Sequence, residues 1–230
     1  KPDLISTNFS DNTVSIFKNQ SNKLLLSYAP KIDIATSEHP EFTCLGDVDG
    51  DGKLDIIVAS DISQVISVYK NISTIANISF MPKIDFVAGV YPISVSVADL
   101  NNDGKPDIIF TNNHDNNVSV LKNKSDSNAI SFAPKKDFAT GSSPGGIAIN
   151  DFNGDGKSDI ATANYFSNTV SVLKNTTVSV NNITFAPKVD FAVGTSPENI
   201  STGDLDSDGK PDLAVNNSFS NYISVLRNAS

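Results

Sequence analysis

Four short segments carry acidic side chains at a regular spacing that is typical of a cation site. Each is nine residues long, with Asp or Asn at positions 1, 3, 5 and 9, Gly at position 6 and Lys at position 7. The segments are Asp47–Asp55, Asp99–Asp107, Asp151–Asp159 and Asp204–Asp212. Calcium prefers about six to eight hard oxygen ligands. We therefore expect one Ca²⁺ in each segment, about four in the chain.

Side chains at every second position of a tight loop can converge on one ion, and Gly at position 6 permits the sharp turn. The Lys at position 7 would contribute only its backbone carbonyl. The candidate ligands are Asp47, Asp49, Asp51, Lys53 and Asp55; Asp99, Asn101, Asp103, Lys105 and Asp107; Asp151, Asn153, Asp155, Lys157 and Asp159; and Asp204, Asp206, Asp208, Lys210 and Asp212. An oxygen cage made entirely by the protein favours Ca²⁺ over Mg²⁺.

The spacing overlaps with that of an EF-hand, but the twelfth position differs. An EF-hand has a bidentate Glu there, whereas these segments have Val58, Phe110, Thr162 and Val215. Helices should flank an EF-hand loop, and here the flanking residues are typical of strands. The sequence therefore predicts calcium loops between strands.

The charge of the chain supports bound cations. The formal net charge is −9, and the ligand positions hold 14 aspartates. Carboxylates crowded into nine residues repel one another when no cation is present. Asp and Gly also favour plain turns, but a plain turn would not require acidic residues at the same spaced positions in all four segments. We expect the ions to be mainly structural, because metal binding of this kind contributes to folding.

The segments recur every 52 or 53 residues, and the sequence between them repeats as well. Each segment is followed by a short apolar run, an alternating run such as Val118–Asn123, a run such as Phe132–Phe138 and a run after a proline turn, such as Pro144–Ile149. These runs are rich in β-branched residues, and no stretch is typical of a helix. Four strands per repeat of this length indicate a propeller blade.

We therefore predict an all-β protein, a β-propeller of four-stranded antiparallel blades with about 4.5 repeats. Strands A to D run outward from the axis, and the aspartate segment joins A to B. The chain then forms five blades, of which the first lacks strand A and the last lacks strand D. The repeat units are 1–53, 54–105, 106–157, 158–210 and a partial unit 211–230, in a single propeller domain or propeller fragment spanning 1–230.

The incomplete blades leave several arrangements open. The chain begins in the middle of the repeat, at Lys1–Asp3, so we interpret it as a piece of a longer or processed protein. The two incomplete blades could meet in one ring, belong to a larger ring or be completed by another chain. Otherwise they leave open sheet edges, which favour association.

In these motifs the sequence resembles the FG-GAP/VCBS repeats, a family that includes the propeller of integrin α chains. The resemblance lies in the aspartate segments, in Val-Ser-Val-Leu-Lys-Asn at 118–123 and 170–175, and in Phe-Ala-Pro-Lys at 132–135 and 185–188, and it covers nearly the whole chain. It implies structural calcium sites and a secreted or cell-surface location. Members serve in adhesion, in glycan binding or as modules beside enzymes, and their rings usually hold more blades.

Residues that recognise a ligand should lie on the face opposite the aspartate segments, where the B–C and D–A loops meet. Positions there diverge between the repeats. The candidate ligand-binding residues are His39, Tyr91, His114, Tyr165 and Phe166. Aromatic rings beside Asn and Asp suit sugar stacking with hydrogen bonds, or contact with a protein. Alternatively, the histidines are merely exposed and the rings pack between blades.

Signals of catalysis are weak, and we predict that the chain is not an enzyme and has no catalytic residue. Gly141–Gly145 matches a G-x-S-x-G nucleophile elbow, but Pro144 follows the serine and lacks the N–H that the oxyanion hole requires. The single cysteine, Cys44, occupies a slot that holds small residues in the other repeats and forms no intramolecular disulfide.

The leading hypothesis is a calcium-stabilised extracellular or cell-surface module for binding or adhesion that recognises a glycan or an extracellular protein. The alternative is a structural module whose open terminal blades form homo-oligomers or filaments. The net charge of −9 argues against nucleic acid, whose phosphates require a basic face. No run of about 18 apolar residues is present, so we expect no membrane insertion.

Overall fold

The structure is a computed structural model that describes residues 1–127 and 129–230, and within these ranges the regular elements are β-strands. They form five sheets. The strands are β1 (Leu4–Asn8), β2 (Thr13–Phe17) and β3 (Ile32–Ala35); β4 (Pro40–Gly46), β5 (Asp55–Ser60), β6 (Val65–Tyr69) and β7 (Ile84–Val87); β8 (Pro92–Ala98), β9 (Asp107–Asn112), β10 (Asn117–Leu121) and β11 (Lys136–Ala139); β12 (Pro144–Asn150), β13 (Asp159–Asn164), β14 (Thr169–Leu173) and β15 (Val189–Ala192); and β16 (Pro197–Gly203), β17 (Asp212–Asn217) and β18 (Tyr222–Leu226).

Each sheet is an antiparallel meander whose spatial order follows the chain. The first sheet has the order β1-β2-β3, the three central sheets have four strands each, and the last has the order β16-β17-β18. We number these sheets as blades 1 to 5. The prediction of five blades, with strand A missing from the first and strand D missing from the last, is confirmed.

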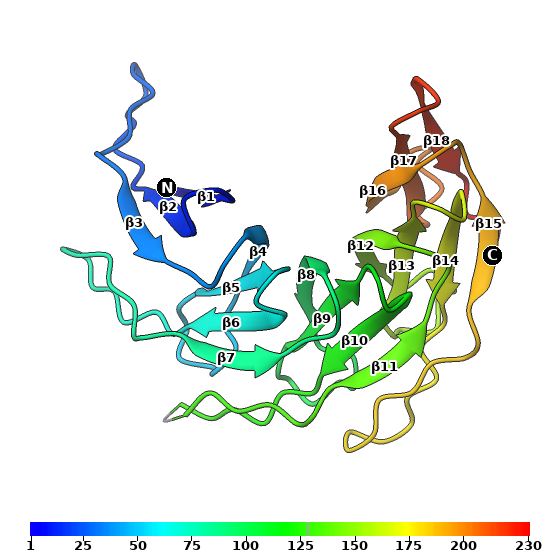
Figure 1. The fold of residues 1–230 in the computed structure, drawn as a ribbon, viewed down its shortest axis with the longest axis horizontal. Coiled ribbons are helices and arrows are strands. Elements are labelled where there is room, and N and C mark those ends of the chain that lie inside the picture. Colours follow the sequence, from blue (N-terminus) through cyan, green and yellow to red (C-terminus); the bar gives the residue numbers. More distant parts are fainter. Residues whose placement is uncertain (128) are drawn as a thin grey trace.

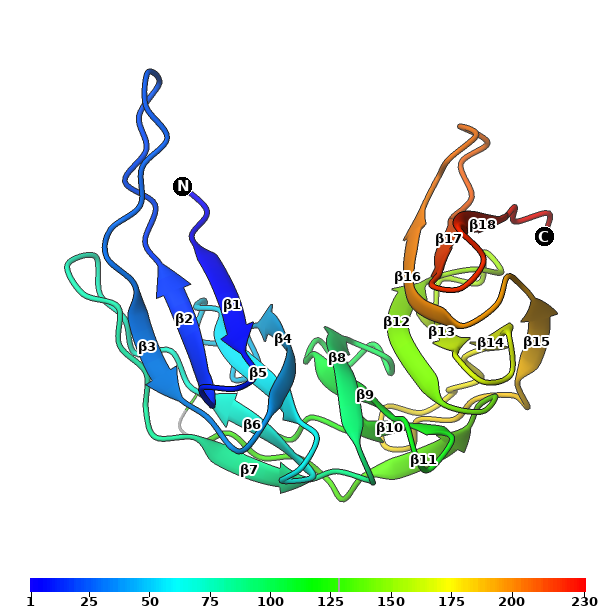
Figure 2. The ribbon, with the colours of Figure 1, turned by 45° about the horizontal axis from the view of Figure 1, so that its top comes forward.

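The blades are arranged around an open arc (Figure 1). The first strands of blades 2 to 5, β4, β8, β12 and β16, lie on the inner side of the arc, and β7, β11 and β15 lie on its outer side. Blade 1 and blade 5 stand at the two ends of the arc and are separated from each other in the view of Figure 2. The arrangement is that of propeller blades in a ring that these five blades do not close.

The apolar core lies between neighbouring blades rather than inside one sheet. Four clusters of buried side chains correspond to the four contacts between successive blades. At the contact of blades 2 and 3, Ile57 and Ile66 pack with Ile108 and Phe110. Alternate residues of a strand point to opposite faces of its sheet. Each central blade therefore contributes to two clusters, and the six residues of β5, β9 and β13 are buried without a break.

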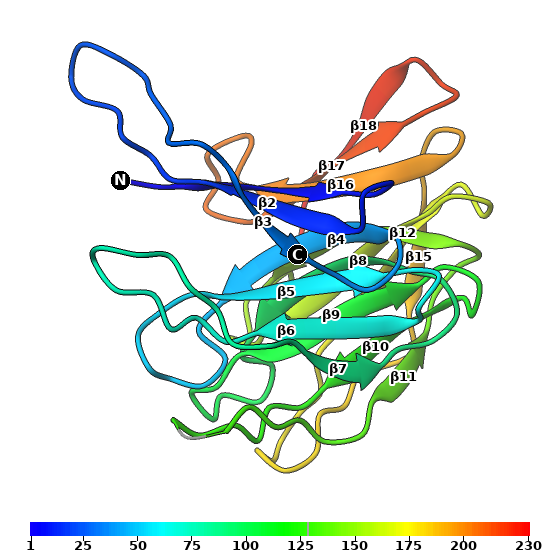
Figure 3. The same cartoon turned by 60° about the vertical axis from the view of Figure 1, so that its left-hand side comes forward.

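The strand register separates two kinds of loop. In blade 2, Gly46 pairs with Asp55 at one end of the sheet, and Pro40 pairs with Ser60 at the other. The aspartate segments therefore lie at one end, which we call the aspartate face. The B–C turns and the D–A loops lie at the opposite end, which we call the loop face. The C–D hairpins that follow β2 and β6 project together from one side of the molecule (Figure 3).

The end of the arc at blade 5 exposes side chains that are covered elsewhere. In strand C of blade 3, Val118 and Val120 are 0% and 2% exposed, because blade 4 packs on them. The aligned residues of blade 5, Ile223 and Val225, are 66% and 57% exposed. The face of blade 5 that points away from blade 4 thus has the apolar side chains of an interface between blades, but no sixth blade covers them.

Candidate calcium centres and recognition face

Two positions of each aspartate segment have a left-handed backbone. Position 6 is Gly in all four segments, with φ between +81° and +85°, a conformation that Gly adopts without steric cost. Position 4 also has a positive φ, at Gly50, Asn102, Gly154 and Ser207. The expected turn at position 6 is present, whereas the turn at position 4 was not predicted. Its signal was the succession of Gly, Asn, Gly and Ser, residue types that are frequent in turns.

The carboxylate at position 1 organises the turn. In the first segment, Oδ1 of Asp47 accepts the N–H groups of Gly50 and Asp51, at 2.9 and 3.0 Å, and Oδ2 accepts that of Gly52 at 2.9 Å. Asp99, Asp151 and Asp204 accept the N–H groups of positions 5 and 6 in their own segments, and Asp151 also accepts that of Gly154. A carboxylate has about four acceptor sites, so these aspartates can still bind a cation.

The carboxylate at position 9 is buried at the start of strand B. Asp55 accepts the N–H of Asn71 at 2.8 Å and that of Val48 at 3.1 Å. Burial raises the pKa of Asp55 to about 6, and it does the same at Asp107. Burial also raises the pKa of Asp159. A nearby cation would favour the ionised form of these groups.

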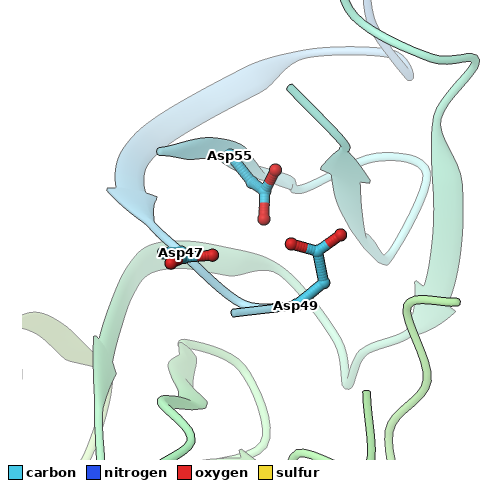
Figure 4. A group of neighbouring side chains, drawn as sticks. All are labelled: Asp47, Asp49 and Asp55. Carbon is cyan, nitrogen blue, oxygen red and sulfur yellow. The ribbon is translucent and has the colours of Figure 1, made fainter. Parts of the chain in front are cut away.

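Positions 3 and 5 complete the acidic cluster. In the first segment, Asp47, Asp49 and Asp55 place one oxygen each within 4.8 Å of one another. Figure 4 shows the carboxylates of Asp49 and Asp55 directed toward each other. In the fourth segment the group consists of positions 1, 3 and 5, Asp204, Asp206 and Asp208. These are the two segments in which position 3 is Asp.

The third segment, which has Asn at position 3, also provides an oxygen for a cation. Oδ1 of Asn153 is buried and has no hydrogen-bond partner among the described residues, and buried polar atoms are normally paired. At position 7, the backbone N–H of Lys53, Lys105, Lys157 and Lys210 donates to the Asp at position 5. The donor set is all oxygen and therefore fits Ca²⁺.

A basic side chain from the end of strand C reaches each segment. Lys70 pairs with Asp49 and lies 3.6 Å from Asp51. Lys122 lies 3.5 Å from Asp103, Lys174 lies 3.5 Å from Asp155, and Arg227 pairs with Asp206 and Asp208. The Lys-Asn ending of strand C is visible in the sequence as part of the repeat, but its contact with the aspartates is not. These ion pairs partly balance the aspartates, so four Ca²⁺ ions are not their only counter-charge.

The asparagine after that basic residue joins two blades. Nδ2 of Asn123, in blade 3, donates to the Val48 carbonyl of blade 2 at 2.8 Å and to the Pro106 carbonyl of its own blade at 2.8 Å. Asn175 and Asn228 repeat this bridge to Leu100 and Phe152. We call these contacts the blade bridges. They tie each of the first three aspartate segments to the following blade.

On the loop face, the candidate recognition residues form ring pairs. The rings of His39 and Phe9 lie 4.3 Å apart, and those of Tyr91 and His114 are stacked at 4.6 Å. Tyr165 contacts Phe166 at 5.1 Å and Phe219 of blade 5 at 6.5 Å. Some of these rings therefore do pack between blades, while Phe166 remains 72% exposed.

A cavity of about 370 Å³ opens on the inner side of this face. Tyr91 and Tyr165 line it, whereas His39, His114 and Phe166 do not. Its wall also includes Glu41, Phe42, Asn113, Glu198 and Asn199. Residues from blades 2 to 5 thus share one cavity. Sequence reasoning missed the two glutamates, and their only signal was that they follow the proline turn.

Two other sequence signals are explained by the fold. Ser143, in the G-x-S-x-G match, has a φ of +60°, as His39, Tyr91 and Ser196 do at the aligned slot with +54° to +63°. Its Oγ donates to Oδ1 of Asn113, so it belongs to an ordinary D–A turn. Burial raises the pKa of the Cys44 thiol to about 12, which leaves it protonated at neutral pH.

Comparison with known proteins identifies the repeat and the fold. The FG-GAP-like repeat matches residues 1–58, 47–110, 99–162 and 151–215. No curated protein matches the chain. In the part of the chain that the structure describes, no helix is long and apolar enough to cross a membrane.

Solved structures share the fold at low sequence identity. A protein of Bacteroides uniformis with the provisional name 6-phosphogluconolactonase matches with a TM-score of 0.69 and 17% identity over 99% of this chain. A Lactobacillus plantarum protein matches with 0.64 and 17% over 98%, and a functionally unknown protein of Desulfotomaculum acetoxidans with 0.60 and 14% over 97%. The chain covers 64%, 64% and 65% of the lengths of those proteins, respectively.

Proposed function

Because the chain belongs to the family of FG-GAP-like repeats, we propose that it is a calcium-stabilised, non-catalytic binding module that recognises a glycan or an extracellular protein. FG-GAP repeats are typical of extracellular proteins, which supports a secreted or cell-surface location. The aspartate face would hold structural Ca²⁺, and the loop face would contact the ligand.

One observation carries this proposal. The acidic segments repeat in each blade at the aspartate face, whereas the tips of the B–C turns at the loop face differ from blade to blade, and this face has a cavity lined by Tyr91 and Tyr165. Aromatic rings with adjacent amides are suited to sugar rings and to protein surfaces. A concave site with a few polar groups is the usual form of a binding site.

The experiment is a glycan array, with a panel of extracellular proteins as a second arm, followed by calorimetry on the hits. A double variant, Tyr91→Ala with Tyr165→Ala, should lose at least about 1.4 kcal/mol of binding free energy, which is tenfold in Kd. The matched control is Ile75→Ala, because Ile75 is fully exposed on the C–D hairpin of blade 2. An array without hits, together with turnover of a polysaccharide, would favour an enzyme instead.

The exposed end of blade 5 favours a second candidate function, assembly through the terminal blades. Ile223 and Val225 are exposed where the aligned residues of blade 3 are covered by the next blade. Another blade of the same kind would fit this face. Light scattering during chromatography tests this role: mass that rises with concentration, and falls in Ile223→Asp, supports assembly, and a strict monomer excludes it.

A further inference from the structure

The loop face combines acidic side chains with a complete lack of lysine and arginine. Its B–C turns span 8–13, 60–65, 112–117, 164–169 and 217–222, and its D–A loops span 36–40, 88–92, 140–144 and 193–197; none of these residues is Lys or Arg. All three glutamates of the chain, Glu38, Glu41 and Glu198, lie in or directly after the D–A loops. The aspartate face, in contrast, has a Lys or Arg beside each acidic cluster.

A buried carboxylate stands next to the wall of the cavity. The side chain of Asp61 is 0% exposed, and its Oδ2 has no hydrogen-bond partner among the described residues. Nδ1 of His39 is 3.6 Å from Oδ1. Glu41 and Tyr91, which line the cavity, also interact with Asp61. Burial, followed by the charge of Asp61, raises the pKa of Glu41. The pKa of Tyr91 is raised chiefly because the Tyr91 hydroxyl contacts Asp61.

This arrangement carries an electrostatic cost in the free protein. A charge without a partner is strongly disfavoured in a buried position. Oδ1 of Asp61 accepts the N–H of Ile62, and the side chains around Asp61 are another carboxylate, a phenol and one histidine. Among these side chains, only a protonated His39 could offset the charge of Asp61. A ligand with a positive charge would reduce this cost on binding, and the adjacent Tyr91 ring could contribute a cation–π contact.

The site fits an organic cation better than a metal ion. The groups of carboxylates, histidines and cysteines that lie close enough to hold a metal in the described residues are those of the first and fourth aspartate segments. Glu41, Asp61 and His39 do not form such a group. An ammonium has three N–H donors and can be joined to a ring that stacks on Tyr91 or Tyr165.

We propose that the cavity between blades 2 and 5 binds an amino sugar with a free, protonated amine, whose ammonium group pairs with Glu41 in front of the buried Asp61. The amides of Asn113 and Asn199 and the exposed Glu198 line the same cavity. They provide the donors and acceptors that ring hydroxyls require, and this favours a sugar over a lysine side chain. The proposal rests on the binding role proposed above, and it specifies the chemistry of the ligand.

The test compares a glucosamine oligosaccharide with its fully N-acetylated counterpart, which has the same length but no charge. Calorimetry at a pH of about 6.5 should give at least tenfold tighter binding of the glucosamine form. Glu41→Gln should remove most of this preference. Glu38→Gln is the matched control, because Glu38 is exposed in the same loop but does not line the cavity.

A second variant separates recognition from folding. Asp61→Asn removes the unpaired charge, so its Tm should remain equal or rise while its affinity for the glucosamine oligosaccharide falls at least tenfold. A fall in Tm with unchanged affinity would show that Asp61 has only a structural role, and it would overturn the proposal.

The remaining outcomes distinguish this inference from the proposed function. If both oligosaccharides bind equally and Tyr91→Ala abolishes the binding, the loop face binds glycans but the proposed preference for an amine is overturned. Binding of an oligolysine peptide alone would retain a binding face but overturn the sugar. Equal losses in Glu38→Gln and Glu41→Gln would indicate attraction by the overall net charge of −9 and would also overturn the proposal. If nothing in either arm binds, both the inference and the proposed function fail.

Discussion

The aspartate face and the loop face are built from the same repeats, yet the side chains at the aspartate face recur in each blade, whereas those at the tips of the loop face change from blade to blade. At the aspartate face, every complete A–B loop has the same two carboxylate anchors, a basic partner and a following asparagine. At the loop face, the residue aligned with Asp61 is Phe9, Asn113, Tyr165 or Ser218. The backbone still repeats there, since the aligned D–A slot has a positive φ in all four copies.

The difference indicates which constraints act on each face. A site that must hold the same ion in each blade needs the same ligands each time. A surface that forms one cavity from several blades needs different side chains in each blade, because each contacts a different part of the ligand.

Calcium removal should have the largest effect and should act through the aspartate face. At a hundredfold excess over Kd, one site contributes about 2.7 kcal/mol of stability, and each kcal/mol corresponds to about 2–4 °C of Tm in a chain of this size. We expect EDTA to lower the Tm by about 20 °C or more in scanning calorimetry. Recovery should occur with Ca²⁺ but not with Mg²⁺. An unchanged Tm would mean that the segments are plain turns.

Loss of a blade bridge should have the next largest effect. Asn123→Ala removes the bond between blades to Val48 together with the local bond to Pro106, and a lost buried hydrogen bond costs about 1–3 kcal/mol. The matched control is Asn71→Ala, since Nδ2 of Asn71 donates to the local Leu54 carbonyl, and Oδ1 of each asparagine accepts a local N–H, that of Ser73 or Ser125. Urea unfolding should show a larger loss in Asn123→Ala. Equal losses would mean that the bridge itself contributes nothing.

The pH dependence of stability should have opposite signs with and without calcium. Asp55 and Asp107 have a folded pKa of about 6, above their unfolded value of about 4. At pH values between about 4 and 6 the folded state binds more protons than the unfolded state. The stability of the calcium-free protein should therefore fall as the pH rises through this window. With Ca²⁺, deprotonation permits binding, and stability should rise. Thermal scans between pH values of about 4.5 and 6.5 measure this, and equal slopes would contradict it.

Substitutions at the loop face should have the smallest effect on stability. Phe166 is 72% exposed, so Phe166→Ala should change the free energy of unfolding by about 0.5 kcal/mol or less. The comparison substitution is Phe110→Ala, because Phe110 is fully buried between blades and should cost about 3–5 kcal/mol. A large loss in Phe166→Ala would show that the loop face is structural after all.

Much of the fold was predictable because the repeat is local. Each blade is a meander of neighbouring strands, so the period of 52 or 53 residues and the alternation of Val118–Leu121 suffice to place the strands. The anchors at positions 1 and 9 were predictable for the same reason. They bond backbone N–H groups at the turn of their own blade, and position 9 also bonds the end of strand C.

Contacts between blades were not predictable from one repeat. Asn123 and Val48 are 75 residues apart, and no pattern within a single blade shows that they meet. The turn at position 4 was missed because Gly permits a positive φ without requiring it, and because Asn and Ser, which occupy this position in two segments, adopt one less often. Which aromatic rings line a shared cavity and which pack between blades also depends on how the blades are arranged.

Short-range spacing in the sequence is thus sufficient to predict the blades, their number and the four acidic segments. That Glu41, Tyr91, Tyr165 and Glu198 share one cavity, and that Asp61 lies buried near it with His39 as its basic neighbour, depends on how the blades pack together. The curvature of the arc brings these residues together, and that curvature arises from packing between blades.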